Sequence, residues 1–133
     1  MIALDTNVLV RFLVQDDPLQ AQAATKVIDQ LTDEAQGFVS REVLIELVWV
    51  LERAYRLSRA EIAVAFDGLL AATELEIEDA DEVAPALELY RNDGFGFADL
   101  MIVAAARRAG AAGMVTFDRK AARLSGVRLL VED

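Results

Sequence analysis

Short apolar runs alternate with longer segments of helical periodicity along the whole of this chain. The short runs end in polar residues or glycine, as strands do, whereas the longer segments repeat apolar residues every three to four positions, as helices do. Strands are expected at residues 2–4, 38–39, 75–77, 114–117 and 127–131, and helices at 8–13, 18–34, 41–55, 59–72, from 81 onward, 98–109 and 119–124. Strands separated by helices in this way predict an α/β fold with a parallel sheet, covered on both faces by right-handed crossovers.

Individual residues mark several of these boundaries. Pro18 suits the first position of a helix, and Asp17 before it avoids the helical region. Ser58 and Glu61 have the spacing of a capping box, which predicts a helix start at this point. Residues 74–78 alternate glutamate with leucine and isoleucine, a pattern typical of an edge strand with one solvated face.

The size and hydropathy of the chain predict one soluble domain over residues 1–133. Hydrophobic residues make up 55% of the sequence, yet no run approaches the roughly 18 apolar residues of a membrane span. The N-terminus carries no basic stretch followed by an apolar one, so no secretory signal is expected. We therefore expect a cytoplasmic protein that has no contact with a membrane.

The chain contains neither cysteine nor histidine, which limits the chemistry it can perform. Disulfides, thiolate nucleophiles, catalytic triads and the ligands that zinc prefers are excluded, so catalysis would depend on carboxylates, hydroxyls, amides, lysine and arginine. The formal net charge is −10, which opposes nonspecific binding to nucleic acid. On charge alone, a surface that merely keeps the protein soluble is the simpler interpretation.

Three aspartates occupy positions at which parallel α/β proteins commonly carry functional side chains. Asp5 and Asp118 each follow an apolar strand, and open α/β sheets place their sites at the carboxyl ends of strands. Asp99 lies at the start of a helix. Each has an ordinary alternative role, because Asp5 and Asp118 can cap the helices that follow them and Asp99 can interact with a helix dipole.

Glu46 differs from these aspartates because it lies inside the apolar stretch VLIELVWVL. Apolar neighbours surround it on every side of the expected helix, so we expect its carboxylate to be buried. A buried carboxylate needs a cation, hydrogen-bond donors or a raised pKa. Arg53, the candidate partner on the same face, is too far along the helix for a direct pair. Metal binding or catalysis is therefore the favoured role of Glu46.

Several carboxylates without histidine or cysteine suit a hard cation such as Mg²⁺ or Mn²⁺. A cation of this kind lowers the pKa of a bound water and stabilises charge on a phosphoryl oxygen, which suggests phosphodiester hydrolysis. Asn7 and Thr116 flank the expected site and could orient a water or a carboxylate, although turn stabilisation and an ordinary strand position explain them equally well. Four basic residues expected near the same sheet end could contact phosphates or simply form a solvated rim: Arg11, Arg41, Arg119 and Lys120.

Four stretches of the sequence resemble the motif regions of PIN-domain nucleases, and especially those of VapC-type toxins. They are MIALDTNVLVRFL at the N-terminus, the glutamate within REVLIELVWVL, FADLMIVAAAR and MVTFDRKAARL. The resemblance spans nearly the whole chain and implies a PIN domain with strand order 3-2-1-4-5. It also implies metal binding by Asp5, Glu46, Asp99 and Asp118, with supporting roles for Asn7 and Thr116.

The activity implied by this resemblance is endonucleolytic cleavage of tRNA, rRNA or mRNA by metal-activated water. The cleavage would leave 5′-phosphate and 3′-hydroxyl ends. Such toxins are typically homodimers silenced by a VapB-type antitoxin, and a basic antitoxin segment would complement the acidic charge of this chain. Lys120 and Ala121 stand where many relatives carry another acid, so we expect one metal ion, and whether a second one binds is left open.

Two other hypotheses remain open at this stage. A receiver-like signalling domain has about this length and an acidic pocket, but it needs an aspartate at the end of its third strand, where this chain has residues 76–78, EIE. A noncatalytic PIN-like binding module would bind no divalent metal and would leave RNA intact.

Overall fold

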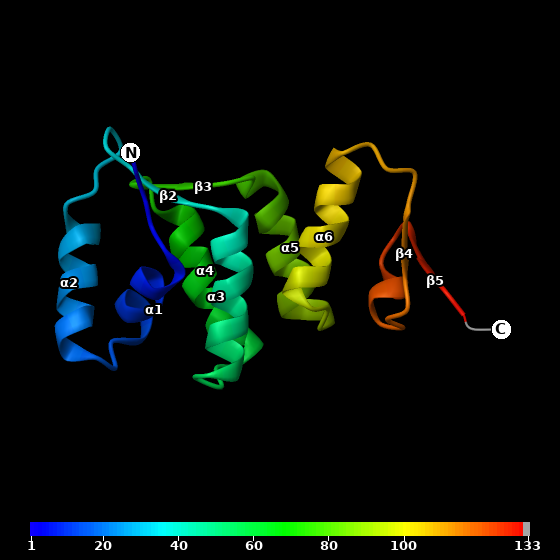
Figure 1. Ribbon diagram of the computed structural model, residues 1–133, viewed down its shortest axis with the longest axis horizontal. Helices are drawn as coiled ribbons and strands as arrows, with labels where there is room; N and C mark the ends of the chain where they lie inside the picture. The colour runs from blue at the N-terminus through cyan, green and yellow to red at the C-terminus, as the bar shows by residue number, and fades with distance from the viewer. Residues whose placement is uncertain (132–133) are drawn as a thin grey trace. The chain divides into compact units, whose positions relative to one another are not determined.

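The computed structural model describes residues 1–131, which form two compact units: residues 1–80, and the residues from Asp81 onward. The first unit contains β1 (Ile2–Ala3), α1 (Thr6–Val14), α2 (Pro18–Asp29), β2 (Gly37–Val39), α3 (Arg41–Arg53), α4 (Arg59–Ala71) and β3 (Leu75–Ile77). The second unit is built from α5 (Ala80–Asp93), α6 (Phe97–Arg108), β4 (Met114–Thr116), the 3₁₀ helix η1 (Ala121–Arg123) and β5 (Val127–Leu129). Figure 1 follows these elements along the chain. The expected succession of strands and helices is confirmed, whereas a single domain over residues 1–133 stays a prediction.

The first unit contains a parallel sheet in the order β1-β2-β3. Phe38 in the central strand pairs with Ala3 on one side and with Glu76 on the other. Beside Phe38, Gly37 leaves room for two leucines, since a Cβ at this position would lie 2.8 Å from one leucine Cδ1 and 2.9 Å from another. β3 is an edge strand with Glu76 exposed and Ile77 buried, as the alternation of residues 74–78 predicted.

Two helix starts form as the sequence predicted. The side chain of Asp17 accepts a hydrogen bond from the backbone N–H of Gln20 at 3.1 Å, which caps α2 ahead of its proline. Ser58 and Glu61 form a complete capping box: the Ser58 hydroxyl accepts from the Glu61 N–H at 3.1 Å, and the Glu61 carboxylate accepts from the Ser58 N–H at 2.9 Å. These bonds satisfy amide groups that a helix N-terminus leaves without partners.

The end of α2 differs from the expectation. The helix was expected to reach about residue 34 but ends at Asp29. Thr32 and Ala35 instead bond to each other through both of their backbone groups at 3.2 Å, and the Thr32 hydroxyl accepts a further bond from the Ala35 N–H. Threonine side chains compete with helical hydrogen bonds in this way, so a local turn replaces the last part of the expected helix.

The core of the first unit lies between its sheet and its helices. α1 packs on α2 and α3, while α4 packs on α3 and β3, and Figure 1 shows α3 and α4 side by side beneath β2 and β3. Each strand of this sheet is added on the same side of the one before it, in the order β1-β2-β3. Right-handed crossovers between strands added in one direction place their helices, α1 to α4, on the same face of the sheet. Leu9, Leu47 and Phe66 are completely buried in this core.

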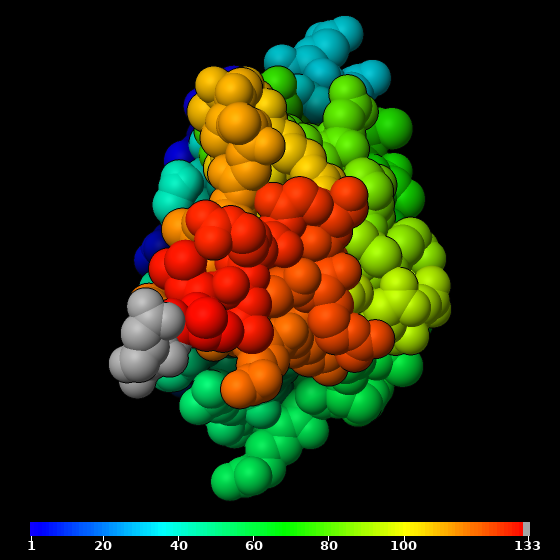
Figure 2. All heavy atoms as spheres, turned by 90° about the vertical axis from the view of Figure 1, so that its right-hand side faces the viewer, coloured from blue at the N-terminus to red at the C-terminus, as the bar shows by residue number. Residues whose placement is uncertain are grey.

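The second unit has its own parallel pair, β4 and β5, in which Thr116 lies opposite Leu129. Figure 2 shows the surface of this segment, where η1 packs beside both strands. Tyr90 of α5 and Phe97 of α6 are buried, and their rings meet edge to face with centroids 6.1 Å apart. This arrangement is a favourable one for two aromatic rings and joins the two helices.

The predicted parallel α/β fold is thus confirmed in both units. The observed pairings contain 3-2-1 and 4-5, while the complete order 3-2-1-4-5 with helices on both faces remains a prediction. Among residues 1–131 no helix is long and apolar enough to cross a membrane.

Candidate functional site

Asp5 begins α1 at the carboxyl end of β1, as the sequence predicted. Its extended backbone (φ −79°, ψ 161°) is that of an N-cap residue, but its side chain accepts no hydrogen bond from the helix that it begins. The residue is exposed. Capping therefore does not explain this carboxylate, which is left available for another role.

The two residues after Asp5 differ in their surroundings. Asn7 is exposed on the first turn of α1 and lines a shallow hollow between α1 and α2 together with Val8 and Val27. Thr6 is only 2% exposed, and its Oγ1 is the one buried side-chain polar atom without a hydrogen-bond partner among residues 1–131. A buried hydroxyl without a hydrogen-bond partner is costly. Thr6 was not identified from the sequence as a residue near the candidate site, and its position between Asp5 and Asn7 was the only sequence feature that pointed to it.

The expectation that Glu46 is buried is wrong. Glu46 is exposed on α3, in a stripe that also contains Glu42, Trp49 and Arg53. Trp49 is 57% exposed, and the guanidinium of Arg53 lies 5.8 Å from the centroid of its indole ring. Of the apolar neighbours of Glu46 in sequence, Leu44, Leu47 and Val48 are buried in the core. Metal binding by Glu46 can therefore no longer be argued from burial, and it rests on the family motif alone.

Asp99 and Asp118 interact in the second unit. Asp99 lies half-buried in the first turn of α6, and both partial burial and the nearby charge of Asp118 raise the pKa of its carboxyl. Gly96 leaves room for the carboxylate, because a Cβ at Gly96 would lie 3.0 Å from Asp99 Oδ2.

Asp118 follows β4 and organises the turn into η1. Its Oδ1 accepts hydrogen bonds from the backbone N–H groups of Lys120 at 2.8 Å and of Ala121 at 3.0 Å, so the capping alternative holds for this residue. The hydroxyl of Thr116 accepts a bond from the backbone N–H of Asp118 at 3.0 Å. Thr116 thereby fixes the backbone that carries the carboxylate, which is more than an ordinary strand position would do.

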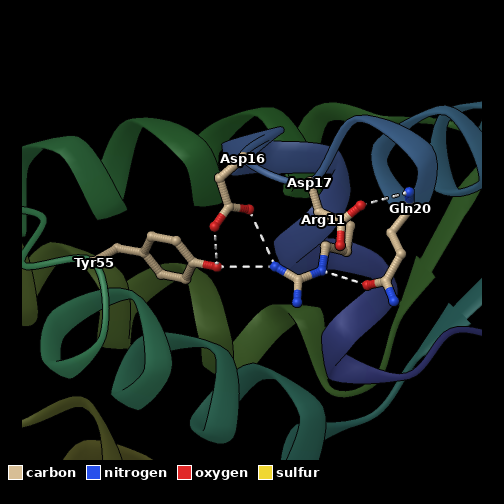
Figure 3. Close-up of polar contacts among 5 residues, drawn as sticks. All are labelled: Arg11, Asp16, Asp17, Gln20 and Tyr55. Atoms are coloured by element: carbon tan, nitrogen blue, oxygen red, sulfur yellow. Dashed lines mark hydrogen bonds and ion pairs between the residues drawn. The ribbon is translucent and has the colours of Figure 1, made fainter.

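Two of the four basic residues that could contact phosphates or form a solvated rim instead bond to other side chains of the protein. Figure 3 shows Arg11 in a cluster with Asp16, Gln20 and Tyr55, to which its guanidinium donates at 3.1, 2.6 and 3.1 Å, respectively. Arg41 is 9% exposed and pairs with Asp79 at 3.3 Å. Neither arginine belongs to a solvated rim.

The expectation that Glu78 belongs to a solvated strand face is also corrected. Its Oε1 accepts a hydrogen bond from the backbone N–H of Arg41 at 2.8 Å, at the start of α3. This contact ties the end of β3 to the end of β2.

The cluster of Arg11, Asp16 and Tyr55 makes stability depend on pH. The Tyr55 hydroxyl donates to Asp16 at 2.9 Å, and this bond is the largest cause of the lowered pKa of Asp16. A lowered pKa stabilises the fold above the ordinary aspartate pKa, about 4, and that contribution is lost as the pH falls through the lowered value. We expect Tyr55→Phe to lower the melting temperature at neutral pH, with the difference from wild type vanishing in acid. Thermal melts across pH test this, and an equal effect of Tyr55→Phe in an Asp16→Asn background would contradict it.

Within each unit, the structure shows the surroundings of the predicted site residues. Asp99 and Asp118 interact within the second unit, while Asp5 and Glu46 are exposed on α1 and α3 of the first. Within neither unit does the described part of the chain gather three or more acidic side chains closely enough to hold a metal ion. The meeting of all four acids at one centre stays a prediction.

The chain is similar in sequence to proteins of a known family. Residues 2–127 match the sequence profile of the PIN domain. A VapC ribonuclease of Aquifex aeolicus (strain VF5) is 28% identical over 125 residues, which cover 93% of this chain and 92% of that protein. Ribonuclease VapC23 of Mycobacterium tuberculosis (strain ATCC 25618 / H37Rv) is 31% identical over 119 residues, covering 89% of this chain and 93% of that protein. The chain therefore belongs to the PIN-domain family and, within it, to the VapC type.

Proposed function

We propose that this protein is a metal-dependent endoribonuclease and the toxin of a toxin–antitoxin pair. The observation that carries the proposal is the interacting pair Asp99 and Asp118, in which the pKa of Asp99 is raised by burial and by the charge of its partner. A cation bound by Asp99 and Asp118 would favour their ionised forms and so would offset both causes of the shift. Perturbed acids of this kind are typical of functional sites. The relatives named as ribonucleases supply the reaction.

The donor chemistry of the proposed site fits Mg²⁺ or Mn²⁺. Its candidate ligands offer only carboxylate oxygens, the ligands that hard cations prefer. Asp118 uses Oδ1 for backbone hydrogen bonds, which leaves Oδ2 available, and the Asp5 carboxylate is not engaged in capping. We therefore assign metal binding to Asp5, Glu46, Asp99 and Asp118. When bound, the metal would lower the pKa of a water and stabilise charge on the scissile phosphate.

The surrounding residues would position these carboxylates and the attacking water. The two N–H groups bound to Asp118 Oδ1 hold the carboxylate in one orientation, and Thr116 fixes its backbone from the strand side. Groups that orient metal ligands in this way can change activity by about 10- to 100-fold. Asn7 presents its amide from the exposed first turn of α1, where it could donate to a phosphate oxygen or accept from a water.

RNA cleavage by the purified protein tests the proposal. We expect cleavage of RNA in the presence of Mg²⁺ or Mn²⁺, with 5′-phosphate and 3′-hydroxyl ends, and no cleavage when EDTA is added. Intact RNA and no metal binding by calorimetry would instead favour a noncatalytic PIN-like module. A receiver-like domain is no longer a candidate, because the match to the PIN domain spans residues 2–127.

The proposal extends to the partners of the protein. We propose a VapB-type antitoxin as its binding partner and a homodimer as its assembly. The net charge of −10 favours a basic antitoxin segment over free RNA. Co-expression with the antitoxin encoded beside it, followed by light scattering of the purified complex, would give the stoichiometry. Failure to recover a complex would contradict the assigned partner.

Gly96 offers a test of the Asp99 carboxylate that leaves every acid in place. Gly96 has φ −66°, which any residue adopts, so Gly96→Ala adds only a methyl group 3.0 Å from Asp99 Oδ2. We expect kcat to fall on the order of tenfold or more, because small displacements of a catalytic group are costly. Stability should change by less than about 0.5 kcal/mol.

Gly68→Ala is the matched control for this substitution. Gly68 lies within α4, and apart from its chain neighbours and the backbone of its own helix, no atom lies within 4 Å of the position a Cβ would take. We expect Gly68→Ala to leave the cleavage rate unchanged and to stabilise the protein by about 0.5–1 kcal/mol, as alanine does in a helix. Equal cleavage rates for wild type and Gly96→Ala would contradict the expectation that cleavage needs the Asp99 carboxylate in its present position.

A further inference from the structure

Lys120 is held beside the acidic pair of the second unit. Its backbone N–H donates to Asp118 Oδ1 at 2.8 Å. This hydrogen bond fixes the backbone of Lys120 relative to a proposed metal ligand. Its ammonium lies against Gly94, where an added Cβ would be 3.0 Å from Nζ. Gly94 and Gly96 belong to the same short loop before α6, so this loop contacts the Lys120 ammonium at one glycine and the Asp99 carboxylate at the other.

The ammonium of Lys120 has no hydrogen bond or ion pair with another side chain in the part of the chain that the structure describes. The other three cations predicted near the site have different surroundings. Arg11 is held in its cluster with Asp16 and Tyr55, and Arg41 is nearly buried against Asp79. Arg119 lines a hollow together with Phe117 and Leu129. Of these four cations, Lys120 is the one whose ammonium lies against the loop that also contacts the Asp99 carboxylate.

We propose that the Lys120 ammonium binds a backbone phosphate of the RNA beside the cleaved bond; this inference rests on the proposed function. A chain of net charge −10 repels a polyanion, so productive binding needs positive charge at the point of contact. Lysine presents a compact point charge with three donors on a flexible stem, which suits a phosphate whose orientation is set by other groups. The contact positions RNA and carries no preference for a base.

Lys120→Ala is the variant that tests this contact, and the sequence offers a matched control. Lys26, the other of the two lysines, is exposed on α2. With a fluorescein-labelled single-stranded RNA of mixed sequence, we expect Lys120→Ala to raise KM on the order of tenfold at unchanged kcat, because a contact made equally in ground and transition states alters only KM. We expect Lys26→Ala to match wild type and Lys120→Arg to restore most of the affinity.

The salt dependence of binding gives a readout that needs no cleavage. Removing one cation from a phosphate makes the slope of log K against log salt shallower by about 0.7 for single strands. We expect this change for Lys120→Ala and not for Lys26→Ala, measured by fluorescence anisotropy in potassium chloride with Mg²⁺, in the Asp5→Asn background that keeps the RNA intact.

The outcomes separate this inference from the proposed function. Cleavage by wild type together with identical KM and salt slope for the two alanine variants would overturn the role of Lys120 and leave the nuclease in place. RNA that is bound but never cleaved would overturn the nuclease, and the salt slopes would still decide on Lys120. A protein that neither binds nor cleaves RNA would overturn both.

Discussion

Asp99→Asn is expected to abolish RNA cleavage while making the metal-free protein more stable. Substituting groups that only orient a metal ligand already costs about 10- to 100-fold, so loss of a proposed ligand should cost at least about 100-fold in kcat. The gain in stability follows from the raised pKa of Asp99, caused by its burial and by the charge of Asp118. The ionised carboxylate is less favourable in the folded chain than in the unfolded one, and asparagine removes this unfavourable charge.

The sign of the pH dependence makes this prediction specific. An aspartate with a raised pKa destabilises the fold once the pH exceeds its ordinary value of about 4, and the full effect is present above the raised pKa. In EDTA, the melting temperature of Asp99→Asn should exceed that of wild type at neutral pH and equal it in acid. Adding Mg²⁺ should raise the melting temperature of wild type more than that of the variant. A less stable Asp99→Asn protein in EDTA would show that the carboxylate is structural.

Leu9→Ala is expected to destabilise the protein by about 2–5 kcal/mol, the range for truncating a buried leucine. Leu9 is completely buried in α1, the helix that begins at Asp5 and packs on both α2 and α3. A loss of this size is a large part of the roughly 5–15 kcal/mol that stabilises a domain. Activity at low temperature should persist, because no proposed ligand is altered.

Leu19→Ala is the control for this substitution, since Leu19 is 79% exposed at the start of α2. Its effect on stability should stay within about 0.5 kcal/mol, as for most surface substitutions. Urea unfolding of the two variants, compared with wild type, measures both values. A loss below about 1 kcal/mol for Leu9→Ala would mean that the neighbouring helices close over the missing side chain.

Local signals in the sequence were sufficient for much of the fold. The alternation of apolar runs with helical segments predicted the order of the elements, and the capping residues Asp17 and Ser58 marked helix starts that the structure confirms. The end of α2 was missed because a turn between Thr32 and Ala35 competes with the helix. Such a competition depends on which set of backbone bonds is more favourable, and periodicity carries no information on that.

The burial and the partners of the candidate site residues were predicted less well than the fold, because they depend on tertiary structure and not on the adjacent residues in the sequence. Glu46 lies among apolar residues in the sequence, but a helix turns about 100° per residue, so a narrow exposed stripe runs through an apolar segment. The commitment of Arg41 to Asp79 was hidden for a related reason, since the partners are distant in the sequence. The interaction of Asp99 with Asp118 followed from the family resemblance and not from spacing.

The exposure of Trp49 has a practical consequence for spectroscopy. It is the only tryptophan of the chain, and its indole is already largely in water in the native state. Its emission maximum should therefore shift little on unfolding, and denaturation is better followed by circular dichroism. The same indole lies one helical turn beyond Glu46, so its emission intensity would report, without any added label, on molecules that approach this face of α3.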